Sequence, residues 1–122
     1  MKNILVVDDD PTIVDIIEDL LKRNGFNTWP AYDAQEAEIA IKRKKPDLIL
    51  LDIMLPKIDG FTFLKNLKAN PEFKDIPVIC VTVLNKKEDL EKGKSLGAAD
   101  YITKPFDPDD LVARIKKVLN LN

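Results

Sequence analysis

Short apolar runs alternate with helix-forming segments along the whole chain, and this alternation limits its fold more than any other feature. The expected strands cover residues 3–8, 27–31, 48–52, 77–82 and 100–103. The expected helices cover residues 11–24, 34–44, 60–69, 86–96 and 108–120. Strands that alternate with helices of this length are typical of βαβ units, whose strands run parallel in one sheet. The pattern therefore predicts an α/β domain.

The polarity of the strands predicts their order. Residues 4–7, 48–51 and 78–81 are apolar throughout, as in strands that helices cover on both faces. Residues 27–29 and 101–103 are more polar and suit the two edges of the sheet. We expect residues 1–122 to form a single doubly wound (βα)5 domain. Its five-stranded parallel sheet would have the flavodoxin-like order 2-1-3-4-5.

Capping residues indicate where the helices begin. Asp10 and Asp107 each precede a proline, which combines an N-cap side chain with a residue that suits the first helical position. Asn85, followed by Glu88 three residues later, has the spacing of a capping box. We therefore expect Asn85 to cap the fourth helix.

Polar side chains of complementary chemistry follow four of the predicted strands. Asp8 ends the first strand and Asp9 follows it, Asp52 ends the third, Thr82 ends the fourth, and Lys104 follows the fifth. The carboxyl ends of parallel strands share one edge of a sheet, and ligands bind there in open α/β folds. Carboxylates suit a hard cation such as Mg²⁺, whereas an ammonium and a hydroxyl suit phosphoryl oxygens. The pattern predicts one site for a cation and a phosphoryl group.

The composition excludes several classes of function. The chain has no histidine, so histidine acid–base catalysis, histidine metal ligation and a phosphohistidine carrier role are excluded. Nineteen basic and 21 acidic residues give a net charge of −2, which offers no reason to expect direct binding of nucleic acid. The one cysteine, Cys80, lies in an apolar run and is expected to be a buried hydrophobe.

The sequence also bears on the compartment. No apolar stretch approaches the roughly 18 residues of a membrane-spanning helix, and the N-terminus has no signal-peptide pattern. We therefore expect no membrane segment and a cytoplasmic location.

The order and spacing of these motifs resemble the receiver domain of bacterial response regulators, the chemotaxis-regulator-like phosphoacceptor domain of two-component systems. The matching segments are residues 4–11, 46–52, 55–60 and 97–106, and the resemblance covers essentially the whole chain. It implies a phosphorylation-dependent signalling switch of a two-component system or phosphorelay. Such a domain is not a turnover enzyme, since its own chemistry is limited to self-catalysed phosphoryl transfer and slow autodephosphorylation.

The resemblance also implies the role of each acidic residue. Asp52 would accept the phosphoryl group from the phosphohistidine of a sensor histidine kinase or a phosphotransfer protein. Asp8, Asp9 and Asp52, together with the backbone carbonyl of Met54, would hold Mg²⁺, with Mn²⁺ as an alternative.

Five further residues take roles from the same resemblance. Lys104 and Thr82 would contact phosphoryl oxygens, and Tyr101 would turn inward when the Thr82 hydroxyl moves toward the phosphoryl group. Gly60 and Pro105 would support the fold. Family members usually have a cis bond between Lys104 and Pro105, although the sequence is compatible with either isomer.

Taken singly, these residues also have purely structural interpretations. Asp10 is better explained as an N-cap than as a ligand, because Pro11 follows it. The Asp8-Asp9 pair could be a capping cluster, Thr82 a β-branched strand residue, Lys104 a solvated loop lysine, and Tyr101 an edge tyrosine with its hydroxyl in water.

Three other classes of protein compete with the preferred interpretation. A phosphohydrolase with an aspartate nucleophile usually has an acid two residues later, where this chain has Met54. A receiver fold that binds partners without phosphate would not need the complete acceptor set. A flavin-binding protein of the same topology would need a Ser/Thr/Gly-rich phosphate loop after the first strand, and Asp8-Asp9-Asp10 stands there instead.

Three apolar residues near the site distinguish the chain from many receivers. Val83 is bulkier than the small residue common after the switch hydroxyl, and Met54 and Leu84 lie where polar side chains can orient attacking water. We hypothesise slow hydrolysis of the phosphorylated state.

Partner surfaces are less sharply defined by the sequence. The first predicted helix has a broad apolar face, at 13, 14, 16, 17, 20 and 21, which either docks a histidine-kinase bundle or is fully buried. Asp100, Asp110 and Arg114 match charges that link some receivers into dimers, but Leu90 replaces a basic partner. We expect a monomer or a weak phosphorylation-dependent dimer. The downstream target or output domain is unknown, and a stand-alone regulator, a relay intermediate and part of a longer regulator all fit.

Overall fold

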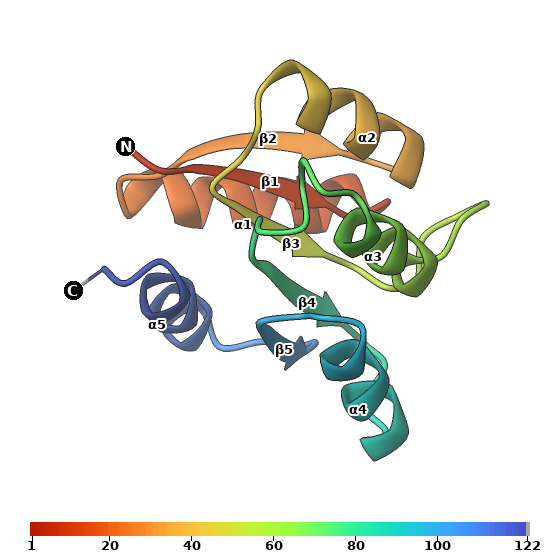
Figure 1. The fold of residues 1–122 in the computed structure, drawn as a ribbon. Coiled ribbons are helices and arrows are strands. Elements are labelled where there is room, and N and C mark those ends of the chain that lie inside the picture. Colours follow the sequence, from red (N-terminus) through yellow and green to blue (C-terminus); the bar gives the residue numbers. More distant parts are fainter. Residues whose placement is uncertain (122) are drawn as a thin grey trace.

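Five parallel strands form one sheet with helices on both faces in the computed structural model, which describes residues 1–121 (Figure 1). The strands are β1 (Asn3–Val7), β2 (Asn27–Ala31), β3 (Leu48–Leu51), β4 (Val78–Thr82) and β5 (Asp100–Thr103). The helices are α1 (Pro11–Arg23), α2 (Ala34–Arg43), α3 (Gly60–Ala69), α4 (Lys87–Ser95) and α5 (Pro108–Val118). The strand order is β2-β1-β3-β4-β5, so the predicted fold and the two predicted edge strands are confirmed.

The strand register places the carboxyl ends of β1 and β3 side by side. Val7 lies opposite Leu51 in the β1–β3 pair. The backbone N–H of Asp52 extends this pairing by donating to the carbonyl of Val7 at 2.9 Å. The residue that follows each strand therefore emerges at the same edge of the sheet.

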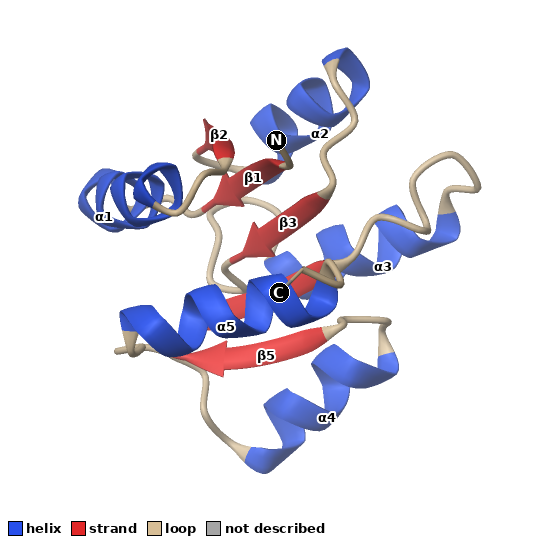
Figure 2. Cartoon of the chain, turned by 90° about the vertical axis from the view of Figure 1, so that its left-hand side faces the viewer, coloured by secondary structure: helices blue, strands red, loops and turns tan. Residues whose placement is uncertain are grey.

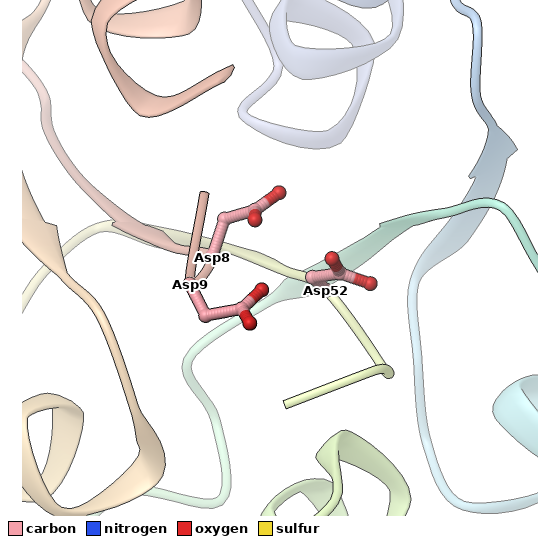
Figure 3. Close-up of side chains that lie close together, drawn as sticks. All are labelled: Asp8, Asp9 and Asp52. Atoms are coloured by element: carbon pink, nitrogen blue, oxygen red, sulfur yellow. The ribbon is translucent and has the colours of Figure 1, made fainter. Parts of the chain in front are cut away.

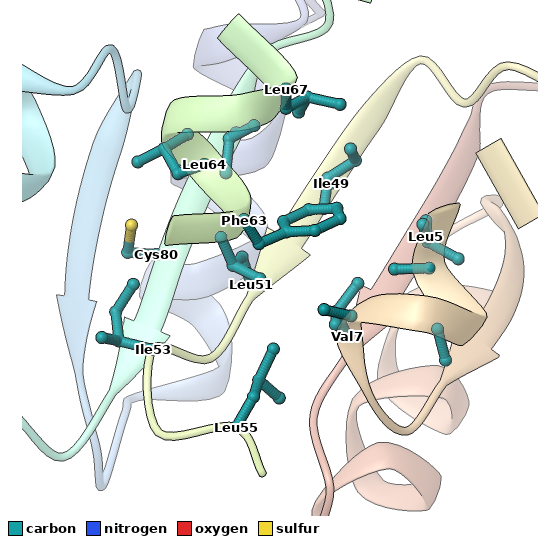
Figure 4. Close-up of a cluster of buried hydrophobic side chains, with 14 of the residues drawn as sticks. Leu5, Val7, Ile49, Leu51, Ile53, Leu55, Phe63, Leu64, Leu67 and Cys80 are labelled. Atoms are coloured by element: carbon teal, nitrogen blue, oxygen red, sulfur yellow. The ribbon is translucent and has the colours of Figure 1, made fainter. Parts of the chain in front are cut away.

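The alternation of side chains along the strands divides the core into two layers. Ile49 and Leu51 of β3 pack in one cluster with residues of α3 (Figure 4). Residues of α2 and Tyr101 of β5 belong to the same cluster. Leu48 and Leu50 pack in a second cluster with residues of α1 and α5. Figure 2 shows the sheet between these helices. Both faces of the central strands are covered, which explains why their sequences are apolar throughout.

Two of the predicted helix starts are confirmed and one is wrong. The carboxylates of Asp10 and Asp107 accept the expected backbone bonds, from Thr12 at 3.0 Å and from residue 109 at 2.8 Å. The fourth helix has Lys86, not Asn85, as its N-cap residue. The carboxylate of Asp89 accepts a hydrogen bond from the Lys86 N–H at 3.3 Å. Asp89 thus takes the capping role expected of Glu88, and the helix begins one residue later than predicted.

Two expectations about burial and the membrane can be compared with the structure. Cys80 is a free, fully buried cysteine, as predicted. None of the helices within residues 1–121 is long and apolar enough to cross a membrane.

Gly60 allows α3 to start directly against the segment that carries Asp52. Its N–H donates to the carbonyl of Ile53 at 2.7 Å. A Cβ atom at this position would lie 2.5 Å from the carbonyl oxygen of Asp52 and 2.5 Å from the Cα of Ile53. Both contacts are with backbone atoms, which cannot rotate away, so only glycine fits without moving the chain.

We expect Gly60→Ala to lower the free energy of unfolding by about 1–3 kcal/mol, the usual cost of overpacking. Urea-induced unfolding of the variant measures this change. Lys65→Ala, at an exposed position of the same helix, is the control and should change the free energy by less than about 0.5 kcal/mol. Equal stability of Gly60→Ala and the wild type would show that the close approach is not required.

Candidate functional site at the carboxyl ends of the strands

Three carboxylates converge at the carboxyl edge of the sheet. Asp8 and Asp9 follow β1, and Asp52 follows β3 (Figure 3). Each offers an oxygen that lies within 4.8 Å of an oxygen of the other two. Asp8 and Asp52 are buried, whereas Asp9 is exposed. The sequence prediction that these three side chains meet is therefore confirmed by the geometry.

Lys104 bridges the two buried carboxylates. Its Nζ donates to Oδ2 of Asp8 and, at 3.1 Å, to Oδ2 of Asp52. Its backbone N–H donates to the carbonyl of Thr82 at 2.8 Å, and the peptide bond between Lys104 and Pro105 is cis. Only 13% of the Lys104 side chain is exposed, so the alternative of a solvated loop lysine is wrong.

The electrostatics of the site follow from burial and from this bridge. Burial raises the pKa of Asp8, and the hydrogen bond from Lys104 opposes that effect without cancelling it. Burial alone would lower the pKa of Lys104, but the bonds and charges of Asp8 and Asp52 outweigh it, so its pKa is raised. Lys104 is therefore a cation at neutral pH. One ammonium faces three acidic side chains, and this excess of carboxyl oxygens favours a divalent cation.

The donor set suits a small hard cation. Asp8 Oδ1 accepts the backbone N–H of Asp10 at 3.0 Å, and Asp52 Oδ1 accepts that of Met54 at 3.1 Å. Within residues 1–121, the Asp9 carboxylate accepts no hydrogen bond, so both of its oxygens are available as ligands. Mg²⁺ prefers oxygen ligands and keeps several waters, which an exposed third carboxylate permits. These residues fit Mg²⁺.

Thr82 and Tyr101 are linked through the backbone of Leu84. The hydroxyl of fully buried Thr82 accepts the Leu84 N–H at 3.4 Å. The hydroxyl of Tyr101 donates to the carbonyl of Leu84 at 2.9 Å. Burial raises the pKa of Tyr101 to about 12, and nearby Cys80 adds to this shift. Tyr101 is 5% exposed, so the alternative of an edge tyrosine with its hydroxyl in water is wrong. The residue already packs in the core here, whereas the resemblance implied that it would turn inward when the Thr82 hydroxyl moves.

The apolar residues near the site are largely exposed. Met54 and Val83 are each 54% exposed. An open surface depression of about 510 Å³ is lined by Asp9, Met54, Leu84 and others, whereas Val83 lies outside it. The sequence indicated the positions of these side chains but not the role of the Leu84 backbone, because a backbone bond to a distant tyrosine leaves no local sequence signal.

The two predicted partner surfaces differ in how they are built. On α1, Ile16 is 52% exposed while Val14 and Ile17 are buried, so the apolar face is not fully buried. Arg114 bonds to Asp100 and Asp110 of its own chain, at 3.1 Å in each case. These three charges therefore have intramolecular partners in the isolated chain.

Comparisons with known proteins agree with this geometry. Residues 4–116 match the family described as the response regulator receiver domain. The chain is 45% identical over 118 residues to the phosphate regulon transcriptional regulatory protein PhoB of Escherichia coli. It is 40% identical over 119 residues to the DNA-binding dual master transcriptional regulator RpaA of a Synechocystis species. The matches cover 97% and 98% of this chain but only 52% and 49% of those proteins, so the chain spans about half their length.

A solved structure gives the same result. The receiver domain of the Francisella response regulator 1452 superposes on this chain with a TM-score of 0.92 and 34% sequence identity, covering 98% of each chain. A TM-score of this size over almost the full length shows that the two chains share one fold.

We expect Mg²⁺ to stabilise the folded chain, because the ion would relieve the repulsion among the three carboxylates. At ten times its dissociation constant, the gain in unfolding free energy is about 1.4 kcal/mol. Thermal unfolding with Mg²⁺ and with a chelator measures it. Asp9→Asn should reduce the response to Mg²⁺, whereas Asp15→Asn, an exposed site on α1, should leave it unchanged. Equal responses in both variants would place the ion elsewhere.

Proposed function

The chain belongs to the response regulator receiver domain family, and we propose that it is a phosphorylation-controlled switch whose acceptor is Asp52. The observation that carries this assignment is the surroundings of the Asp52 carboxylate. One of its oxygens accepts a hydrogen bond from Lys104, and the carboxylates of Asp8 and Asp9 lie close by. Asp52 is held at the end of a rigid central strand, and carboxylates of this kind serve as nucleophiles toward phosphoryl groups.

The donor we propose is the phosphohistidine of a sensor histidine kinase or a phosphotransfer protein. An oxygen of Asp52 would attack the phosphorus, a P–O bond would form, and the P–N bond to the donor imidazole would break. The imidazole would leave with the bonding electron pair and take up a proton. Phosphoryl transfer depends mainly on positioning and charge neutralisation, and the fixed ammonium of Lys104 supplies both next to Asp52.

The metal ligands we propose are the carboxylates of Asp8, Asp9 and Asp52 and the backbone carbonyl of Met54. When bound, Mg²⁺ supplies positive charge that offsets the negative charge of the incoming phosphoryl group. Lys104 would then exchange its bond to Asp8 for one to a phosphoryl oxygen, since Asp8 would be neutralised by the ion. Asp10 remains the N-cap of α1 in this scheme.

The switch we propose runs from Thr82 to Tyr101 through Leu84. If the Thr82 hydroxyl turns to donate to a phosphoryl oxygen, it no longer accepts the N–H of Leu84. The loop that begins with Val83 can then move, and the same loop carries the carbonyl that holds the Tyr101 hydroxyl. A modification shifts a population only by interacting differently with two states, and this hydrogen-bonded chain provides that difference.

The competing phosphohydrolase assignment is disfavoured by the surroundings of Asp52. The position two residues later is Met54, whose exposed side chain has no acid to protonate a leaving group. We further propose that the isolated chain is a monomer or a weak phosphorylation-dependent dimer, because Arg114 is paired within its own chain.

We expect a gain of one phosphoryl group in the intact mass after incubation with Mg²⁺ and acetyl phosphate. The gain should be absent in Asp52→Asn and retained in Asp59→Asn, which alters the exposed N-cap of α3. A phosphorylated histidine-kinase domain serves as a second donor, since Val83 could exclude small donors. If neither donor modifies the wild type, the proposed function is wrong.

We expect the phosphorylated state to be long-lived because Met54 and Leu84 offer no polar group to orient attacking water. Replacing both by asparagine should accelerate loss of the phosphoryl group on the order of tenfold, equivalent to about 1.4 kcal/mol in the barrier. Intact mass over time after donor removal measures the rate, and Ile58→Asn, an exposed apolar residue in the same loop region, is the control. An unchanged rate in the double variant would contradict the hypothesis.

A further inference from the structure

We propose that a pocket between α2 and the β2 edge of the sheet binds a small planar aromatic carboxylate. The pocket encloses about 340 Å³, which is within the range of small-ligand sites. Its lining residues include Leu5, Trp29, Ile39, Ala40, Arg43 and Lys44. The proposed phosphoacceptor function does not depend on this site, nor does this site depend on that function.

The pocket exists because α2 presents small side chains to the sheet. Figure 1 shows α2 beside β2 and β1. Ala34 and Ala37 are the buried contacts of this helix, together with Ile41. Ala40 is only partly buried, and Leu5 lies in register with Trp29 on the neighbouring strand. Because Ala40 is small, an apolar hollow remains next to Leu5, which a larger side chain at position 40 would fill.

Two large apolar residues in the lining of the pocket are partly exposed. Trp29, the chain's only tryptophan, is 38% exposed, and Ile39 is 50% exposed. The ammonium of Lys44 lies over the Trp29 ring, 4.6 Å from its centre, and so covers one ring face. A planar aromatic ligand would pack against the remaining ring surface, or displace the ammonium and pair its own negative charge with it.

The charges at the rim select an anion. Arg43 and Lys44 line the pocket and belong to the run of basic residues 42–45. Within residues 1–121, Arg43 forms no ion pair, so its guanidinium is free to bind a carboxylate in a bidentate manner. Glu36 is the acidic residue in the lining, and one of its oxygens already accepts the N–H of Tyr32 at 2.8 Å. The balance at the rim is therefore positive.

The pocket is separate from the carboxylate site. Asn3, the first residue of β1, and Pro46, which precedes β3, line it, so it lies toward the amino ends of the strands. Asp8, Asp9 and Asp52 lie at the opposite, carboxyl edge. A strand addition at the β2 edge is a poorer explanation for this surface, because Pro30 lacks an N–H to pair with a further strand.

The test uses 2-naphthoate as the probe and two-dimensional ¹⁵N–¹H NMR of the full chain as the readout. We expect saturable shifts of the Trp29 indole N–H and of the Ile39 and Ala40 amides. The neutral analogue 2-naphthamide should bind with a Kd about fivefold higher. This is the loss expected from removing an exposed ion pair at the upper end of the usual range. Absence of saturable shifts at these three groups, or equal affinity for the two probes, would overturn the proposal.

Two pairs of variants locate the binding. Ile39→Asp should abolish the shifts, while Ile16→Asp, at an equally exposed isoleucine on α1, should preserve them. Arg43→Gln should remove the preference for naphthoate over naphthamide, and Arg23→Gln on α1 should not. Ala40→Leu fills the pocket from within and should also prevent binding. Binding that survives both Ile39→Asp and Ala40→Leu, or shifts centred on Asp52, would contradict the assignment.

Discussion

The site depends on the ammonium of Lys104, which donates hydrogen bonds to both Asp8 and Asp52. The register of β1 and β3 forces two carboxylates to emerge next to each other, partly out of water. Unpaired, two such charges would repel each other and resist burial. Lys104 reaches them because its backbone is tied to the end of β4, and the raised pKa keeps it protonated. The third carboxylate, Asp9, stays in water and leaves the cluster negative enough to attract a divalent cation.

The rest of the fold holds the two parts of that edge in different ways. Central strands covered on both faces, and α3 packed against the backbone of Asp52 through Gly60, hold the proposed acceptor in place. The loop after β4 is held through the backbone of Leu84. The Leu84 N–H donates to the Thr82 hydroxyl, and the Leu84 carbonyl accepts the Tyr101 hydroxyl. In the proposed switch, a change at Thr82 would reach Tyr101 through Leu84 while the strands stay in place.

The sequence was sufficient to predict the fold and the assembly of the site, because both depend on local patterns. Apolar runs such as residues 48–51 define central strands, and a parallel sheet brings their ends together. The start of α4 was missed because Glu88 and Asp89 compete for the same capping role, and the choice depends on how the preceding loop leaves β4. The resemblance implied an inward turn of Tyr101 only in response to phosphorylation, whereas its hydroxyl is already bonded to the Leu84 carbonyl in this structure. This bond and the bonds of Lys104 to both Asp8 and Asp52 could not be predicted, since they join residues more than 15 positions apart. The pocket beside Trp29 also had no sequence signal, because it forms where the small Ala40 of α2 meets the partly exposed ring of Trp29 on β2.

Borohydride reduction of the phosphorylated chain, followed by peptide mass spectrometry, tests the central claim most directly. Reduction converts an aspartyl phosphate to homoserine and so marks which of the clustered carboxylates carried the phosphoryl group. If Lys104 and the strand register make Asp52 the nucleophile, homoserine will be found at residue 52 alone. Homoserine at residue 8 or 9 would mean that the geometry of the cluster does not select the acceptor, and the account of the site would be wrong.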